Sequence, residues 1–255
     1  MYKYNFVNRR DGVIVTKGQQ SAVIEFLFQP ICNLSDNSTK FYEILSRVTS
    51  QTGETYNSQD FFENIGDDFI KELCLNQIIS SKILKIKKTV SINITLSCLS
   101  DRSFVEEILS FNSRNIALEI NELNCYSSSE DINSNISLLQ ENGIMIWLDD
   151  YHENNECANL SLGKIQWDMI KIDKRFLHYN GDDLMAIKAL SYVLRPFTKQ
   201  GLIFEGVETA THSSLVKSTG AFGQGFFYSI PQKWQGDILR EKYEHNIKKN
   251  IINSI

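Results

Sequence analysis

Short apolar stretches of strand length alternate along this chain with segments whose apolar residues recur at helical spacing. The short stretches are rich in β-branched and aromatic residues, which favour β-strands. There are eight of them: EFLFQPICNL (25–34), KFYEILSRV (40–48), TVSINIT (89–95), IALEI (116–120), IMIWLDD (144–150), MIKID (169–173), LIFEGVE (202–208) and GQGFFYSI (223–230).

Helices are predicted between most of these stretches. Apolar residues within 70–78, 132–139 and 184–194 recur every three or four positions, as on one face of a helix. Ser103 and Glu106 form a capping-box pattern, which predicts that a helix begins there. The segment THSSLVKSTG (211–220) predicts a short helix that ends at its glycine.

The order of these elements predicts the fold class. The first two strands are joined only by SDNST (35–39), which is too short for a helix, so we expect them to be antiparallel. The remaining strands alternate with helices, as in parallel sheets. Eight such strands predict an α/β fold, a modified (β/α)8 TIM-like barrel with an antiparallel first strand.

The domain boundaries follow from the same pattern. No Gly/Ser-rich or Pro-rich linker divides the chain, so residues 23–255 are predicted to form a single barrel domain. Residues 1–22 are interpreted as a peripheral N-terminal extension. The tail REKYEHNIKKNIINSI (240–255) is predicted to be a final helix with a basic face.

Composition indicates the class of protein and its cellular location. Hydrophobic residues make up 42% and charged residues 22% of its 255 residues, which is usual for a soluble domain, and the net charge of −5 does not favour nucleic-acid binding. The five scattered cysteines contain no CxxC pair, which indicates reduced thiols and a cytoplasmic location. Neither a signal peptide nor the ~20-residue apolar run of a membrane span is apparent, so no membrane association is expected.

Polar residues appear where these buried strands end. Acids, amides and one amine occupy these positions: Glu43, Asn93, Glu119, Glu122, Asp149, Asp150, Lys171, Asp173, Glu205, Glu208 and Gln224. Barrel enzymes build their sites at the carboxyl ends of strands. Oxygen ligands of this kind suit Mg²⁺ or Mn²⁺, and two such ions can clamp the oxygens of a phosphoryl transfer. A lysine among them could orient or deprotonate the attacking water.

Each position also has a purely structural interpretation. Glu43 alone could be a solvated charge, and Asn93 a turn residue. The Asp149–Asp150 pair could cap a helix, and Lys171 could extend along the surface. Asp173 could pair with a neighbouring cation. The joint pattern, with nearly every strand end polar, favours the site.

The chain resembles the EAL domain, the cyclic di-GMP phosphodiesterase barrel, here as a stand-alone copy. FQPICNL is similar to the YQPI segment of the family, and EILSR stands in place of EALLR. VSINIT, LEINE and LDDY resemble the NxS/T-type strand, the ExTE motif and the DDFG motif. IKIDKRFL, FEGVET and GQGFFYSIP resemble the KIDxxFV, AEGVET and QGYxFxxP motifs. The eight motifs occur in the family's order, from about residue 26 to residue 231.

The resemblance implies a two-metal site. It assigns the first metal to four ligands, Glu43, Asn93, Glu119 and Asp149. Asp149 would bridge to the second metal, with Asp150 beside it and Glu205 completing the second-metal and water network.

It also implies a catalytic set and a substrate site. Lys171 would position or activate the water, acting with Glu43 and Glu205. Arg47 would pair with a substrate phosphate, as its forked donors allow.

Gln29 and Gln224 would contact the substrate, and Gln224 would also hold a metal-bound water or a neighbouring ligand. Glu122 would brace the loop after the aspartates. The implied reaction is hydrolysis of one phosphodiester of cyclic di-GMP to linear pGpG, in bacterial second-messenger signalling.

The segment after the aspartates departs from the family. Active members carry a glycine-rich FGTGYSS-like loop there, whereas this chain has YHENNECAN (151–159), with His152 in place of glycine. Histidine adopts positive φ less readily than glycine, so we expect a different loop path, weaker binding of the second metal, slower turnover and altered dimerisation. Asn121 also replaces the usual threonine.

Two functions stay open at this point. One is a phosphodiesterase, since every ligand type is present. The other is a catalytically inactive EAL-like module that binds cyclic di-GMP or a protein partner such as a transcription regulator, since the loop is degenerate. A barrel enzyme acting on another phosphate ester fits the motif order less well. A homodimer and a regulatory protein partner are further hypotheses.

Overall fold

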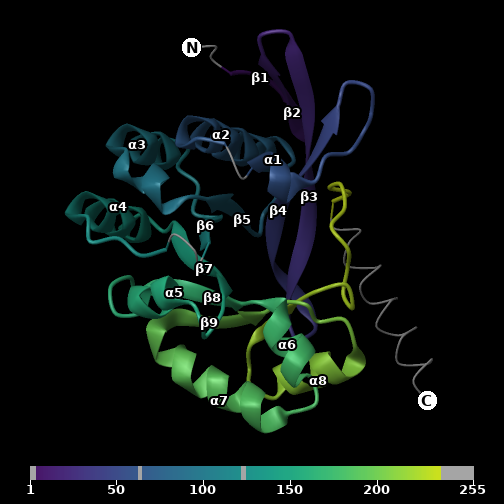
Figure 1. Cartoon of the computed structure of the whole chain (residues 1–255), viewed down its shortest axis with the longest axis vertical. Helices are drawn as coiled ribbons and strands as arrows, with labels where there is room; N and C mark the ends of the chain where they lie inside the picture. The colour runs from purple at the N-terminus through teal and green to yellow at the C-terminus, as the bar shows by residue number, and fades with distance from the viewer. Residues whose placement is uncertain (1–3, 63–64, 122–124, 237–255) are drawn as a thin grey trace.

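The computed structural model describes residues 4–62, 65–121 and 125–236 (Figure 1). Its strands are β1 Asn5–Arg9, β2 Gly12–Lys17, β3 Gln20–Asn33, β4 Ser38–Ser50, β5 Thr89–Ile94, β6 Ile116–Asn121, β7 Met145–Tyr151, β8 Trp167–Ile172, β9 Thr198–Phe204 and β10 Phe222–Gln224. Its α-helices are α1 Ser58–Phe62, α2 Asp67–Ile83, α3 Arg102–Ser110, α4 Glu130–Glu141, α5 Glu156–Ser161, α6 Lys174–Asn180, α7 Leu184–Leu194 and α8 Ala210–Lys217.

Strands β3 to β10 close into a barrel. Neighbouring strands from β4 to β10 pair in parallel, and β3 closes the ring by pairing antiparallel with both β4 and β10. The helices lie around the outside of this ring (Figure 1). The predicted fold class, a modified (β/α)8 barrel with an antiparallel first strand, is therefore confirmed. All eight predicted strands are present, although β10 is only three residues long.

Apolar side chains fill one end of the barrel interior. A fully buried cluster inside the ring consists of Ile31, Ala117, Trp147, Met169 and Ile203. A second and larger core packs the outer faces of the strands against the helices. Because side chains alternate between the two faces of a strand, the residue two positions after each interior apolar residue also points inward.

Helix α3 begins two residues earlier than predicted. The helix is present, but its N-cap is Asp101, whose Oδ1 accepts hydrogen bonds from the backbone N–H of Ser103 (3.0 Å) and Phe104 (3.3 Å). Glu106 instead binds Arg102 one turn away, at 3.0 Å. The capping box predicted for Ser103 and Glu106 is wrong, because Asp101 already satisfies the free amides at this end.

The two ends of the chain differ in what the structure describes. The stretch 5–17, within the expected N-terminal extension, forms strands that continue the sheet beyond β3, and Val13 and Val15 on β2 are buried. The sequence pattern did not predict these strands. The predicted final helix over 240–255 lies outside the described residues. Among the helices that are described, none has the length and apolarity needed to cross a bilayer.

Candidate metal centre

The strand register brings polar side chains together above the apolar cluster. Each of these residues follows an inward-facing residue of its strand by two positions, so it points into the barrel nearer to the carboxyl end. The pairs are Phe41 and Glu43, Ala117 and Glu119, Trp147 and Asp149, Met169 and Lys171, and Ile203 and Glu205. The antiparallel β3 runs the other way, so Gln29 precedes Ile31 and lies opposite Glu43.

Lys171 lies at the centre of the carboxylates. Its Nζ is 2.7 Å from Asp149, 2.9 Å from Glu205, 3.0 Å from Glu119 and 3.3 Å from Glu43. Only 1% of the residue is exposed. The interpretation of Lys171 as a surface lysine is therefore wrong, and four strands contribute acids to a single ammonium group.

Side-chain amides hold Glu43 in place. Gln224 Nε2 donates to Glu43 Oε2 at 2.5 Å and to Gln29 Oε1 at 3.1 Å. Asn93 Nδ2 donates to the other oxygen of Glu43 at 3.2 Å. Gln29 in turn donates to the backbone carbonyl of Ser229, at 3.2 Å. The Glu43 carboxylate is thereby fixed on both oxygens before any ligand enters.

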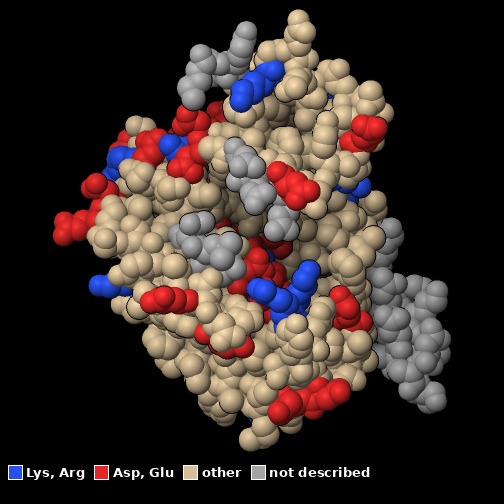
Figure 2. Space-filling model, viewed as in Figure 1, with Lys and Arg blue, Asp and Glu red and all other residues tan. Residues whose placement is uncertain are grey.

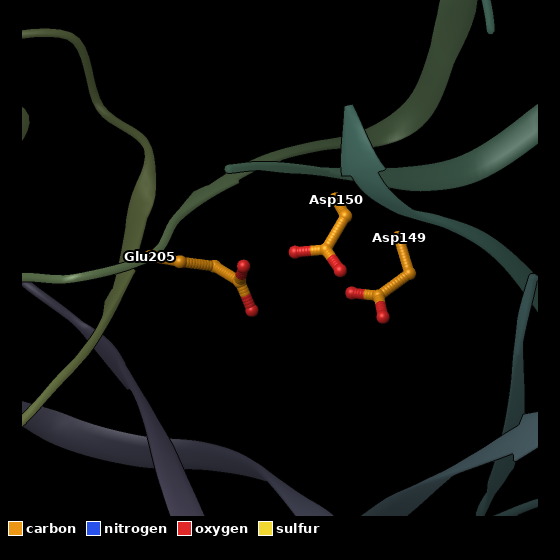
Figure 3. Close-up of side chains that lie close together, drawn as sticks. All are labelled: Asp149, Asp150 and Glu205. Carbon is orange, nitrogen blue, oxygen red and sulfur yellow. The ribbon is translucent and has the colours of Figure 1, made fainter. Parts of the chain in front are cut away.

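A backbone irregularity turns both aspartates toward the barrel mouth. The β7–β8 register shifts between Leu148 and Tyr151, and Asp150 has a φ of 54°. Consecutive strand residues normally face opposite sides, and a bulge with one left-handed residue removes this alternation. The carboxylates of Asp149, Asp150 and Glu205 then point toward one another, each offering an oxygen within 4.8 Å of the others (Figure 3). Asn121, which replaces the usual threonine, donates to Asp150 Oδ2 at 3.4 Å.

Burial dominates the protonation of this cluster. It raises the pKa of Glu119 and of Glu205 well above the ordinary value and that of Asp149 to about 6; Lys171 opposes the rise, and neighbouring carboxylates add to it. Burial would also raise the pKa of Glu43, but Lys171 and the amides outweigh it and lower that pKa. For Lys171 burial acts to lower the pKa, yet the surrounding carboxylates raise it well above its usual range.

The donor set fits hard divalent cations. Four carboxylates, from Glu43, Glu119, Asp149 and Glu205, surround one fully buried ammonium, and the carboxylate of Asp150 lies beside those of Asp149 and Glu205. Oxygen donors in this number are the ligands that Mg²⁺ and Mn²⁺ prefer. Burial and the repulsion between neighbouring carboxylates both raise the pKa values of Glu119 and Glu205, and a divalent cation would offset both effects.

Most of the predicted site residues share one pocket. It has a volume of about 440 Å³, and its lining includes Gln29, Glu43, Asn93, Asp149, Asp150, Lys171, Glu205 and Gln224. Glu119 lies beneath it, fully buried. Sequence reasoning missed Lys174 and Phe226, which also line the pocket. Both lie inside quoted motifs, at positions where the family pattern specifies no lysine or phenylalanine.

Other predicted residues lie apart from the cluster. Arg47 is absent from the pocket lining; its Nε and Nη2 donate to Glu25 Oε2, at 2.9 and 2.5 Å. Glu25 also binds Lys233 at 2.5 Å. Asp173 caps α6 and binds Arg175 at 2.6 Å, in keeping with its structural interpretation. Glu122 lies outside the described residues.

The segment after the aspartates folds into the start of a helix. Asn155 caps α5 by accepting from the N–H of Ala158 at 2.9 Å, and Tyr151 donates to Asn159 at 2.8 Å. His152 accepts from the N–H of Asn154 at 3.2 Å. Asparagine side chains thus fix the path of this segment through local hydrogen bonds. The Asp pair itself caps no helix here, because Asn155 does so.

A family comparison matches this architecture. The model for the EAL domain matches residues 16–231. The chain belongs to the EAL domain family. The family expected from the motifs is therefore confirmed, and the carboxylate cluster described above lies within the matched residues.

Curated EAL relatives share moderate identity with this chain. Cyclic di-GMP phosphodiesterase TpdA of Vibrio parahaemolyticus is 28% identical over 236 residues, which cover 86% of this chain and 40% of TpdA. Probable cyclic di-GMP phosphodiesterase PdeG of Escherichia coli K12 is 25% identical over 224 residues, covering 80% of this chain and 44% of PdeG. The chain spans less than half the length of these two relatives.

Solved EAL structures share its fold. Bacillus subtilis YkuI, in complex with cyclic di-GMP and calcium, has a TM-score of 0.69 at 20% identity and covers 90% of this chain and 61% of its own. A stand-alone EAL protein from Vibrio cholerae O395, bound to cyclic di-GMP, has a TM-score of 0.67 at 19% identity, covering 82% and 92%. Klebsiella pneumoniae BlrP1, in a manganese and cyclic di-GMP complex, has a TM-score of 0.68 at 19% identity, covering 91% and 60%.

Proposed function

We propose that this chain is a metal-dependent phosphodiesterase that hydrolyses cyclic di-GMP to linear pGpG. The observation that carries the proposal is the convergence of four carboxylates on Lys171, with Asp150 beside Asp149 and Glu205, and with Glu43 held by the amides of Asn93 and Gln224. The names of the curated relatives TpdA and PdeG agree with it. A cytoplasmic location with reduced thiols belongs to the same proposal.

The carboxylates would hold two metal ions, with Mg²⁺ or Mn²⁺ as candidates. Glu43, Asn93, Glu119 and Asp149 would bind the first. Asp149, Asp150 and Glu205, whose oxygens already lie within 4.8 Å of one another, would bind the second. When bound, such cations polarise the phosphodiester and offset the charge that develops on its oxygens.

Lys171 would position the attacking water. Its ammonium lies 2.7 Å from Asp149 and 2.9 Å from Glu205, so it sits among the proposed metal ligands as a hydrogen-bond donor. The fixed hydrogen bonds from Gln224 and Asn93 would keep Glu43 aligned during the reaction. Preorganised groups of this kind need not rearrange as charge develops.

The test is turnover by the purified chain. Incubation with cyclic di-GMP and Mg²⁺ or Mn²⁺, followed by chromatography, is expected to yield pGpG. Glu43→Ala removes the carboxylate that Lys171, Gln224 and Asn93 all contact, so it is expected to abolish turnover. Glu141→Ala, at an exposed acid on α4, is the matched control and should keep wild-type activity. Equal activity of both variants would refute the proposal.

A non-catalytic module is the second candidate. The observation that favours it is the segment 151–159, which runs into α5 and contains no glycine, unlike the loop of active members. Binding of cyclic di-GMP, or of a regulatory protein, without pGpG at any metal concentration would establish this alternative. A homodimer would be tested on the same sample by its mass in solution.

A further inference from the structure

Of the two lysines that line the pocket, Lys174 has no ion-pair partner among the described residues. Five acids line the pocket, namely Glu43, Asp149, Asp150, Glu205 and Glu208, against two cations, Lys171 and Lys174. Lys171 is buried and neutralised by the carboxylates around it. Lys174 is exposed, and within the part of the chain that the structure describes no carboxylate lies at ion-pair distance from it.

The backbone of Lys174 is held firmly at the pocket edge. It is the first residue of α6, whose N-cap Asp173 accepts from the N–H of Arg175 at 2.7 Å. Gly206 packs directly against it: a Cβ at Gly206 would lie 2.5 Å from the Lys174 Cβ, and the φ of Gly206 is +65°. The loop that follows Glu205 therefore packs tightly against the start of α6. The Lys174 side chain extends from this contact to the pocket.

The surface shows the same arrangement. Figure 2 has an acidic hollow on this face, with basic side chains gathered at its edge where α6 begins in Figure 1. An anionic substrate that enters an acidic pocket is repelled unless a cation meets it. The buried Lys171 cannot fulfil this role from beneath the carboxylates.

We infer that Lys174 binds the second phosphate of cyclic di-GMP, the one that is not hydrolysed. This inference rests on the proposed function. The reacting phosphate must lie over Asp149, Asp150 and Glu205, so the other phosphate of the ring is left for the pocket edge. A lysine serves there as a point charge for phosphate oxygens, and the exposed ammonium can follow the ligand as it enters. Lys174 would thus favour cyclic dinucleotides over substrates with a single phosphodiester.

The experiment compares two substrates across three variants. Lys174→Gln removes the charge at similar length, Lys174→Arg keeps it, and Lys164→Gln changes an exposed lysine away from the pocket. For cyclic di-GMP, Lys174→Gln is expected to raise KM about tenfold with kcat nearly unchanged, the loss of one charge-assisted phosphate contact. Lys174→Arg and Lys164→Gln should stay within about twofold of wild type. For bis(p-nitrophenyl) phosphate, which has one phosphodiester, all three should match the wild type.

Each outcome decides the question. If the wild type hydrolyses cyclic di-GMP and Lys174→Gln leaves KM unchanged, the inference fails while the proposed function stands. Equal losses on both substrates would also overturn it, because they would place Lys174 at the metal cluster. If the wild type binds without turnover, the dissociation constant replaces KM and the same tenfold shift is required. A wild type that neither binds nor hydrolyses cyclic di-GMP overturns the proposed function and this inference together.

Discussion

Lys171→Met tests how the buried charges of the barrel balance. The lysine is 1% exposed, and four carboxylates lie within 3.3 Å of its Nζ. Methionine keeps most of the side-chain volume but removes the ammonium that, among the described residues, pairs with all four of these acids. Removing one partner of a buried ion pair lowers the free energy of unfolding by about 3–5 kcal/mol, because the remaining charges are left uncompensated. We expect a loss of this size at about pH 8 without metal.

Glu119→Gln is the matched opposite change. Glu119 is fully buried, and its pKa is raised well above the ordinary value, so a neutral amide resembles the state that burial favours. We expect this variant to be as stable as the wild type without metal, or more stable, although it removes a predicted metal ligand. Only one of the two substitutions should therefore destabilise the metal-free protein.

The assay is urea denaturation in EDTA and again with Mn²⁺. The divalent ion should restore part of the stability of Lys171→Met, because it supplies the missing positive charge. It should stabilise Glu119→Gln less than the wild type, because a ligand is gone. If Lys171→Met unfolds at the wild-type urea concentration without metal, or if Glu119→Gln is the less stable variant, the proposed balance of charges is refuted.

Three further predictions follow from the same structure. Burial raises the pKa of Asp149 from 3.8 to about 6, so protonation of Asp149 stabilises the folded state. This contribution of about 3 kcal/mol is fully present below pH 3.8 and is lost as the pH rises through 6. Asp149→Asn should therefore flatten the pH dependence of the metal-free melting temperature. Replacing 151–159 with a glycine-rich EAL loop should raise the rate of pGpG formation, and no gain would argue against the expectation that this segment limits turnover. Asp101→Ala should lower the unfolding free energy by about 1 kcal/mol in urea titrations, whereas Ser103→Ala should leave it nearly unchanged, because Asp101 is the cap of α3.

Much of the fold was predictable because its signals are local. Strand residues in this barrel alternate between the interior and the helix-covered face, and both faces are apolar over much of each strand. Such strands appear in the sequence as short apolar runs rich in β-branched residues. The antiparallel β3 followed from the length of the connection at 35–39. The capping residue of α3 and the strands β1 and β2 were missed. In both cases a neighbour decides the outcome: Asp101 competes with Ser103, and β2 becomes a strand by pairing with β3.

The amino-acid sequence by itself determined which residue types meet at the barrel mouth, since motif order and two-residue periodicity place Glu43, Glu119, Asp149 and Lys171 on inward faces. Only the tertiary structure decided how they interact. Closing the ring puts one ammonium within reach of four acids from separate strands, and burial there shifts the pKa values of the group. The β3–β4 register likewise sets Glu25 opposite Arg47, and the Arg47 guanidinium donates to the Glu25 carboxylate. Distances and desolvation of this kind depend on contacts between residues far apart in the chain, which no local pattern records.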